Sequence, residues 1–235
     1  MELDWSEQSH HIRTLFRPWQ PGDGYEEEAL QAAEARLGAR LPATLRTFYR
    51  IWGKRRDLTQ LTDPMLSPDA VVIRADTLIF WVENQAIYYW GVPLEAGEEA
   101  NPPVAITTSG PKGWEVESEL HWKPSHPHVS SFLDDMLYRN AFNTHGALHG
   151  GWTGSNPPAL LAHHFVWLEE HWRKASIVSP MVFGYAADQT IALPPLYVRD
   201  GQAFYSFGWC CLAAREAEVV DEIAHRFQIT WATRW

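Results

Sequence analysis

Cysteine is almost absent from this chain, whose 235 residues include only Cys210 and Cys211. Neighbouring side chains of an extended strand point to opposite faces, so a disulfide between these two would be strained. We therefore expect two reduced thiols in the core. A chain of this length buries roughly 70% of its unfolded surface and needs no covalent cross-link to fold.

Long apolar runs are also missing. No stretch approaches the roughly 20 apolar residues that a membrane-spanning helix needs. The first segment, Met1–Gln20, mixes acidic and basic side chains with apolar ones and lacks the apolar centre of a signal peptide. We expect a cytoplasmic protein with no membrane partner.

Basic residues are in the minority, because 19 Lys and Arg stand against 29 Asp and Glu, for a net charge of −10. This balance argues against affinity for nucleic-acid phosphates and favours a basic partner. The imbalance is concentrated between Leu61 and Glu119, where the only basic residues are Arg74 and Lys112. A solvated surface explains each carboxylate singly, whereas the clustering of carboxylates favours a binding face.

Recognisable catalytic motifs are missing as well. The sequence has no phosphate-binding loop, no Gly-x-Ser-x-Gly elbow, no dinucleotide fingerprint and no His-Glu-x-x-His zinc pattern. His163 and His171 share a helix face, but two helical turns, about 12 Å, separate them, which is too far for one ion without further ligands. Cys210 lies in an apolar run, which favours a structural thiol over a nucleophile. We expect no cofactor, no metal and no catalysis.

The first third of the chain has the pattern of two helices and a hairpin. Asp23 and Glu26 have capping-box spacing before a helix that ends at Gly38, and a second amphipathic helix follows Leu41-Pro42 and ends at Gly53. Two β-branched and aromatic runs, Thr77–Glu83 and Ala86–Gly91, flank Asn84-Gln85 and predict a β-hairpin with a two-residue turn. Both hairpin faces are apolar, so we expect it inside a sheet with a helix on at least one side.

The remainder mixes strand and helix signals. Helices are predicted after Ser130 or Ser131, after Pro157 and over Ala217–Phe227, with a Gly-rich loop at Gly146–Pro158. The predicted strands are Val104–Thr107, Trp114–Trp122, Met181–Ala186, Leu196–Arg199, Ala203–Leu212 and Gln228–Trp231, with a turn at Asp200-Gly201.

This order predicts an α+β fold with a central, mostly antiparallel sheet flanked by helices. Two stretches, Pro93–Pro103 and Gly146–Pro158, have the composition of linkers. Too few strands flank them for independent sheets, so we expect one domain over residues 1–235.

Two segments resemble the SUKH superfamily, the bacterial immunity proteins related to a fungal cell-wall-synthesis regulator and to Syd. The first is the helix pair that contains Arg36-Leu37-Gly38, Leu41-Pro42, Tyr49 and Trp52-Gly53. The second is the hairpin Phe80-Trp-Val-Glu-Asn-Gln85, which leads to Tyr89-Trp90-Gly91. Together they cover about a third of the chain, and no residue after Asn101 carries the resemblance.

The resemblance implies a SUKH-like fold and a role as cognate antidote to a secreted polymorphic toxin, commonly a nuclease. Nuclease surfaces that bind phosphates are basic, so an acidic face accelerates encounter and aromatic anchors prolong the complex. The residues that we expect to face a basic toxin domain are Asp76, Glu83, Glu95, Glu98, Glu99, Glu115, Glu117 and Glu119.

Two other interpretations stay open. A protein-interaction or regulatory adaptor of the same fold would have no toxin partner. A hydrolase that uses the acidic cluster would instead need a deep pocket with converging carboxylates. The oligomeric state is not predicted.

Overall fold

A computed structural model of the chain describes residues 14–61, 63–108, 120–142, 149–153, 162–175, 196–206 and 210–234. Contacts between Cα atoms divide the chain into two units. The described part of the first unit lies within Trp19–Met136, and that of the second within Trp5–Pro18, Leu137–Ile177 and Ile191–Trp235. The boundary falls inside a helix and at neither linker-like stretch. A single domain over residues 1–235 remains a prediction.

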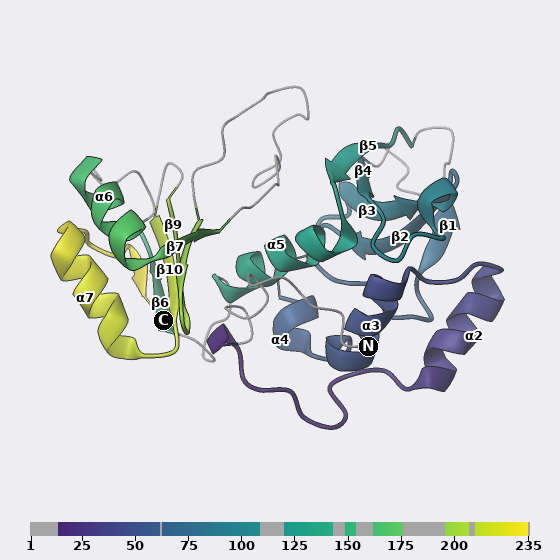
Figure 1. Cartoon of the computed structure of the whole chain (residues 1–235), viewed down its shortest axis with the longest axis horizontal. Coiled ribbons are helices and arrows are strands. Elements are labelled where there is room, and N and C mark those ends of the chain that lie inside the picture. Colours follow the sequence, from purple (N-terminus) through teal and green to yellow (C-terminus); the bar gives the residue numbers. More distant parts are fainter. Residues whose placement is uncertain are drawn as a thin grey trace. The chain divides into compact units, whose positions relative to one another are not determined.

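The sheet of the first unit is an antiparallel meander, in which each strand pairs with the next in sequence (Figure 1). Its strands are β1 (Val72–Arg74), β2 (Thr77–Val82), β3 (Tyr88–Pro93), β4 (Val104–Thr108) and β5 (Lys123–His126). The predicted hairpin is therefore β2 and β3, and both strands lie inside the sheet.

A β-bulge in β2 determines how this hairpin packs. The register between β2 and β3 shifts between Ile79 and Trp81, which leaves Phe80 as an extra residue. Both Phe80 and Trp81 therefore contact Phe132, with ring centroids 5.2 and 5.5 Å from that ring. Phe132 belongs to α5 (Val129–Ala141), so this helix covers one face of the sheet. A smaller apolar cluster contains Ile79, Val82 and Tyr89.

The N-terminus of α5 is capped by a residue distant in sequence. Asn101 Oδ1 accepts a hydrogen bond from the Ser130 amide at 3.0 Å, and Asn101 Nδ2 donates to Ser130 Oγ at 2.8 Å. The Val129 amide donates to the carbonyl of Pro102 at 2.8 Å. The loop before β4 thus supplies the cap that the sequence analysis assigned to Ser130 or Ser131.

Helices α2 (Glu27–Leu37) and α3 (Ala43–Trp52) confirm the predicted pair, and Gly38 ends α2 with a left-handed φ of 65°. A short helix, α4 (Arg56–Thr59), follows. The predicted capping box is wrong, because Glu26 is the N-cap of α2 without a side-chain capping bond. The Asp23 carboxylate instead accepts a hydrogen bond from the Gln20 amide at 2.8 Å.

The second unit contains a six-stranded antiparallel sheet in the order β11-β6-β10-β9-β8-β7. The strands are β6 (His149–Trp152), β7 (Arg173–Ala175), β8 (Leu196–Arg199), β9 (Gln202–Ser206), β10 (Cys210–Ala214) and β11 (Thr233–Arg234). Helices α6 (Ala162–His171) and α7 (Ala217–Phe227) lie together on one face of this sheet (Figure 1). The core between them includes Leu168, Tyr197, Phe204, Leu212, Val220, Ile223 and Phe227. Cys210 and Cys211 are free thiols, as predicted, and Cys210 is buried.

Several predicted boundaries are wrong for local physical reasons. The connection between β2 and β3 has five residues instead of the two-residue turn predicted at Asn84-Gln85, and Ala86 adopts a left-handed φ of 56°. The expected loop at Gly146–Pro158 contains β6. Its Gly151 lets the ring of Trp231 approach so closely that an added Cβ would lie 2.3 Å from it.

The expected strand Ala203–Leu212 is two strands, β9 and β10, and the last strand is β11 instead of Gln228–Trp231. Residues 120–122 of the expected Trp114–Trp122 strand belong to no strand, and β5 begins after them. Trp114–Glu119 and Met181–Ala186 lie outside the described residues.

The α+β class with antiparallel sheets is confirmed, although the strands form two sheets instead of one central sheet. Within the described ranges, no helix has the length and apolar character to cross a membrane.

Candidate partner-binding surface

Four of the predicted acidic residues meet at one end of the five-stranded sheet. Asp76 ends the turn between β1 and β2, and the short 3-10 helix η1 (Leu94–Ala96) follows β3 at the same end. The Leu94 amide donates to the carbonyl of Asp76 at 2.9 Å, which joins the turn to η1. We call the resulting set the acidic rim, and its members are Asp76, Glu95, Glu98 and Glu99, all exposed.

The other predicted acids do not join the rim. Glu83 follows β2 at the opposite end of the sheet, about 20 Å away at the usual rise of a strand. Its carboxylate accepts hydrogen bonds from the amides of Gln85 at 2.9 Å and Ile87 at 3.2 Å. Glu83 therefore stabilises the hairpin connection. Glu115, Glu117 and Glu119 lie outside the described residues.

The rim carboxylates are available to a partner. Among the residues that the structure describes, none of the four forms an ion pair or accepts a side-chain hydrogen bond. Glu27 and Asp69 differ, because hydrogen bonds to Arg46 and Ser67 respectively lower the pKa of each carboxyl below its usual value. An exposed carboxylate without a partner has no existing ion pair to break before it forms a new one.

Backbone contacts hold the rim in place. Ala75 and Asp76 have φ values of 44° and 54°, a pair of left-handed residues that matches the twist of a tight antiparallel turn. On the other side, the carbonyl of Ala100 accepts hydrogen bonds from both the amide and the hydroxyl of Thr44, each at 2.9 Å. The loop that carries Glu98 and Glu99 is thus fixed to the first turn of α3.

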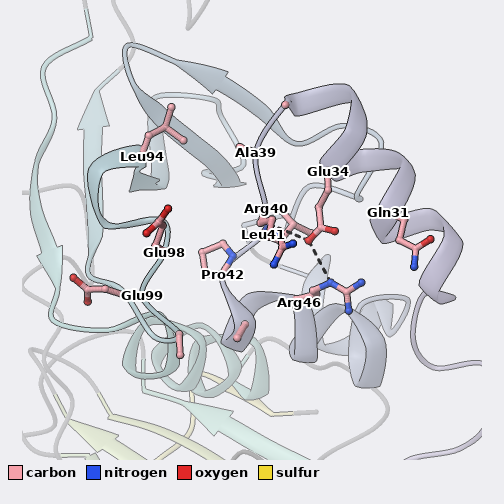
Figure 2. A pocket seen from close by; sticks show the side chains of 14 residues that line it. Gln31, Glu34, Ala39, Arg40, Leu41, Pro42, Arg46, Leu94, Glu98 and Glu99 are labelled. Atoms are coloured by element: carbon pink, nitrogen blue, oxygen red, sulfur yellow. Dashed lines mark hydrogen bonds and ion pairs between the residues drawn. The ribbon is translucent and has the colours of Figure 1, made fainter.

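A groove of about 990 Å³ lies beside this loop. Figure 2 shows Glu98 and Glu99 on one side of it and Glu34 and Arg46 on the other, with Pro42 between them. The carboxylates therefore do not converge on one point. Acid–base chemistry by paired carboxyls needs both groups free on either side of a substrate, and here Glu34 is engaged by Arg46. The groove therefore suits contact with a partner surface better.

Arg46 contributes little positive charge to this groove. Its guanidinium donates to the carboxylates of Glu27 and Glu34, and the hydrogen bond to Glu27 raises the pKa of Arg46 above its usual value. The amide of Leu41 also donates to Glu34, at 3.1 Å. Arg46 and Glu34 therefore join α2 to the start of α3, and the groove charges that remain for a partner are Arg40, Glu98 and Glu99.

A smaller cleft of about 410 Å³ lies on the other side of η1. Asp76 and Glu95 line it, together with the half-buried ring of Trp122 and the exposed Lys123. Apolar side chains form much of its wall, including three prolines: Pro93, Pro103 and Pro124. The rim therefore separates a polar groove from a cleft that combines carboxylates with apolar surface.

Neither a protein family, nor a curated protein, nor a solved structure matches this chain. The resemblance to the SUKH superfamily therefore depends on the two sequence segments alone. The function has to be argued from the rim and its two hollows.

A buried polar cluster lies between β5 and α5, and the sequence analysis did not predict it. His126 Nε2 lies 3.5 Å from Asp135 Oδ2, and His126 Nδ1 lies 2.8 Å from Ser125 Oγ. The contacts follow the order of a hydrolase triad, but His126 and Asp135 are 4% and 3% exposed, and neither hollow is lined by Ser125. The His126 ring also packs edge-on against Phe132 at 5.2 Å. We assign this cluster to the attachment of β5 to α5.

Within the described ranges, no group of three or more His, Cys, Asp and Glu side chains is placed to hold a metal ion. His163 and His171 both belong to α6. The exposed ring of His171 stacks on the ring of Trp167, with centroids 4.6 Å apart. No sequence pattern predicts the two hollows. They depend on the contact between η1 and the β1–β2 turn, which no local pattern encodes.

Proposed function

We propose that this chain is an immunity protein, which binds a basic toxin domain stoichiometrically and occludes it through the acidic rim. The observation that carries the proposal is that four exposed carboxylates, none paired with another described residue, gather on η1 and on the loops beside it, between two hollows. Such a face attracts a basic surface over distances of about 10 Å, and the hollows offer space for side chains of the partner. The SUKH resemblance supplies the class of partner.

The carboxylates suit binding better than catalysis. A catalytic pair, as in glycoside hydrolysis, needs two free carboxyls about 5 to 10 Å apart on either side of the scissile bond. Here Glu34 is engaged by Arg46 and the Leu41 amide, while Glu98 and Glu99 lie on the opposite side of the groove (Figure 2). The proposed mode of action is therefore steric: the bound protein covers the toxin's phosphate-binding surface.

The test is calorimetric titration of the protein, at low and at moderate salt, into a toxin domain encoded by a neighbouring gene. The expected result is one-to-one binding with a nanomolar dissociation constant that rises with salt. A rim variant, Asp76→Asn with Glu95→Gln, Glu98→Gln and Glu99→Gln, should bind at least about tenfold more weakly.

A control variant keeps the net charge of the rim variant. It carries Glu28→Gln, Glu170→Gln, Glu218→Gln and Glu222→Gln, four exposed acids on α2, α6 and α7, none of which lines either hollow. We expect near wild-type affinity for it. Equal weakening of both variants would contradict the assignment of the rim. No binding of the wild type at either salt would reject the toxin pairing and favour an adaptor of the same fold.

A further inference from the structure

We propose that the cleft between Asp76, Glu95 and Trp122 is a pocket for one basic side chain of the partner, with arginine preferred over lysine. This inference deepens the proposed function, because it identifies the contact at which the rim would hold a basic protein.

Both the charge and the shape of the cleft favour an arginine side chain as its ligand. Asp76 and Glu95 approach it from two separate elements, the β1–β2 turn and η1, which the hydrogen bond between Leu94 and Asp76 holds together. Two acidic residues that line one cleft match a guanidinium, which offers several N–H donors in one plane. A volume of about 410 Å³, open to solvent, accepts a side chain and excludes a folded element.

The apolar walls explain why the ligand is a long basic side chain and not a small cation. Trp122 packs against the apolar cluster of Ile79, Val82 and Tyr89, so its ring is held in position. Pro93, Pro103 and Pro124 extend the wall. The methylene stem of arginine packs on such a surface while its charge stays beside the carboxylates. Arginine also stacks on aromatic rings and is more weakly hydrated than lysine.

Lys123 gives the proposal a prediction of opposite sign. Its exposed side chain lines the same cleft and repels a cationic ligand. Lys123→Gln should therefore tighten binding of a basic ligand, whereas Asp76→Asn and Glu95→Gln should weaken it. A cation bound elsewhere on the surface would respond to these three substitutions only through their screened long-range charge, so the changes would be much smaller.

The first experiment needs no toxin. The full chain, labelled with ¹⁵N, is titrated with N-acetyl-arginine-N-methylamide to about 100 mM at constant ionic strength, because single exposed ion pairs and cation–π contacts are weak. The reporter is the indole N–H resonance of Trp122, assigned by its loss in Trp122→Phe. The neutral isostere N-acetyl-citrulline-N-methylamide is the matched ligand, and the lysine analogue tests the preference.

We expect a progressive shift with the arginine ligand, at least about threefold smaller with citrulline and intermediate with lysine. The shift should fall in the double variant Asp76→Asn/Glu95→Gln and persist in Glu98→Gln/Glu99→Gln, which has the same charge but acts on the other hollow. Equal shifts with arginine and citrulline, or equal loss in both double variants, would overturn the pocket.

The second experiment separates this inference from the proposed function. In the toxin titration, Asp76→Asn/Glu95→Gln should weaken binding roughly three- to tenfold more than Glu98→Gln/Glu99→Gln. If the toxin does not bind at all while the arginine ligand does, the immunity role fails and the pocket stands. If the toxin binds and both double variants weaken its binding equally, the result supports the rim as the binding face and rejects the arginine pocket.

Discussion

Ala86 adopts a backbone conformation that alanine rarely occupies. Its φ of 56° lies in the left-handed region, at the end of the connection between β2 and β3. This conformation costs a residue with a Cβ about 1 kcal/mol, and glycine avoids the cost at a smaller loss of chain entropy. Ala86→Gly should therefore raise the free energy of unfolding by about 0.5 kcal/mol, measured by urea denaturation.

The same chemical change at a helical position provides the control. Ala35 is exposed within α2, and Ala35→Gly should lower the free energy of unfolding by about 1 kcal/mol. A loss of stability at both positions would show that the left-handed conformation of Ala86 is not a source of strain.

Tyr197 should ionise well outside the usual range for tyrosine. Its side chain is buried, and burial together with the nearby charge of Glu169 raises its pKa from 10.0 to about 12. The folded state therefore holds the phenol proton more tightly than the unfolded chain does. The resulting stabilisation is complete below pH 10 and is lost as the pH rises toward about 12.

Absorbance at 295 nm, compared between wild type and Tyr197→Phe, measures this titration directly. The part of the absorbance change that this substitution removes should titrate near pH 12. Far-UV circular dichroism shows over which pH range the protein stays folded. In Glu169→Gln the same amplitude should move to lower pH, because the second cause of the raised pKa is removed. An amplitude that titrates at pH 10 in the folded protein would contradict the burial argument.

At the scale of single elements, α5 depends on a cap that lies outside its own segment. Asn101 satisfies the Ser130 amide from the loop before β4, and such caps contribute about 1 kcal/mol. Asn101→Ala should lower the free energy of unfolding by this amount, while Asn101→Asp, which keeps the acceptor, should lose less. Asn84→Ala, at an exposed hairpin position, should change stability by less than about 0.5 kcal/mol. Equal effects of Asn101→Ala and Asn84→Ala in urea denaturation would reject the cap.

The same helix shows which features the sequence could predict. Apolar periodicity located α3, α5 and α7, and the turn at Asp200-Gly201 located the hairpin of β8 and β9, because these signals are local. The cap by Asn101, the bulge at Phe80 and the glycine-rich strand β6 depend on partners distant in the sequence. No window of a few residues contains that information.

The candidate site likewise has features that the sequence predicts and features that it does not. Composition predicted a binding face among the acidic residues between Leu61 and Glu119, and the structure brings four exposed ones together as the rim. Composition could not distinguish Glu83, whose carboxylate is occupied by the amides of its own hairpin. Nor could it find Trp122 beside Asp76 and Glu95, since the register of β4 and β5 creates that proximity.

At the scale of the whole molecule, the net charge of −10 and the local field of the rim make different predictions for association with a basic partner. Net charge acts over the whole surface and is screened beyond about 10 Å at 0.1 M salt. A local cluster orients the encounter and therefore acts mainly on the association rate.

Stopped-flow measurement of binding to the toxin domain from 20 to 500 mM NaCl separates the two effects. We expect the association rate constant of the wild type to fall by about tenfold or more over this range, with a much smaller change in the dissociation rate constant. The control variant has lost four charges on α2, α6 and α7 and should keep most of this salt dependence. The rim variant has lost the same number of charges and should lose most of it. If the two variants show the same salt dependence, then net charge alone steers association, and the clustering of Asp76, Glu95, Glu98 and Glu99 has no kinetic role.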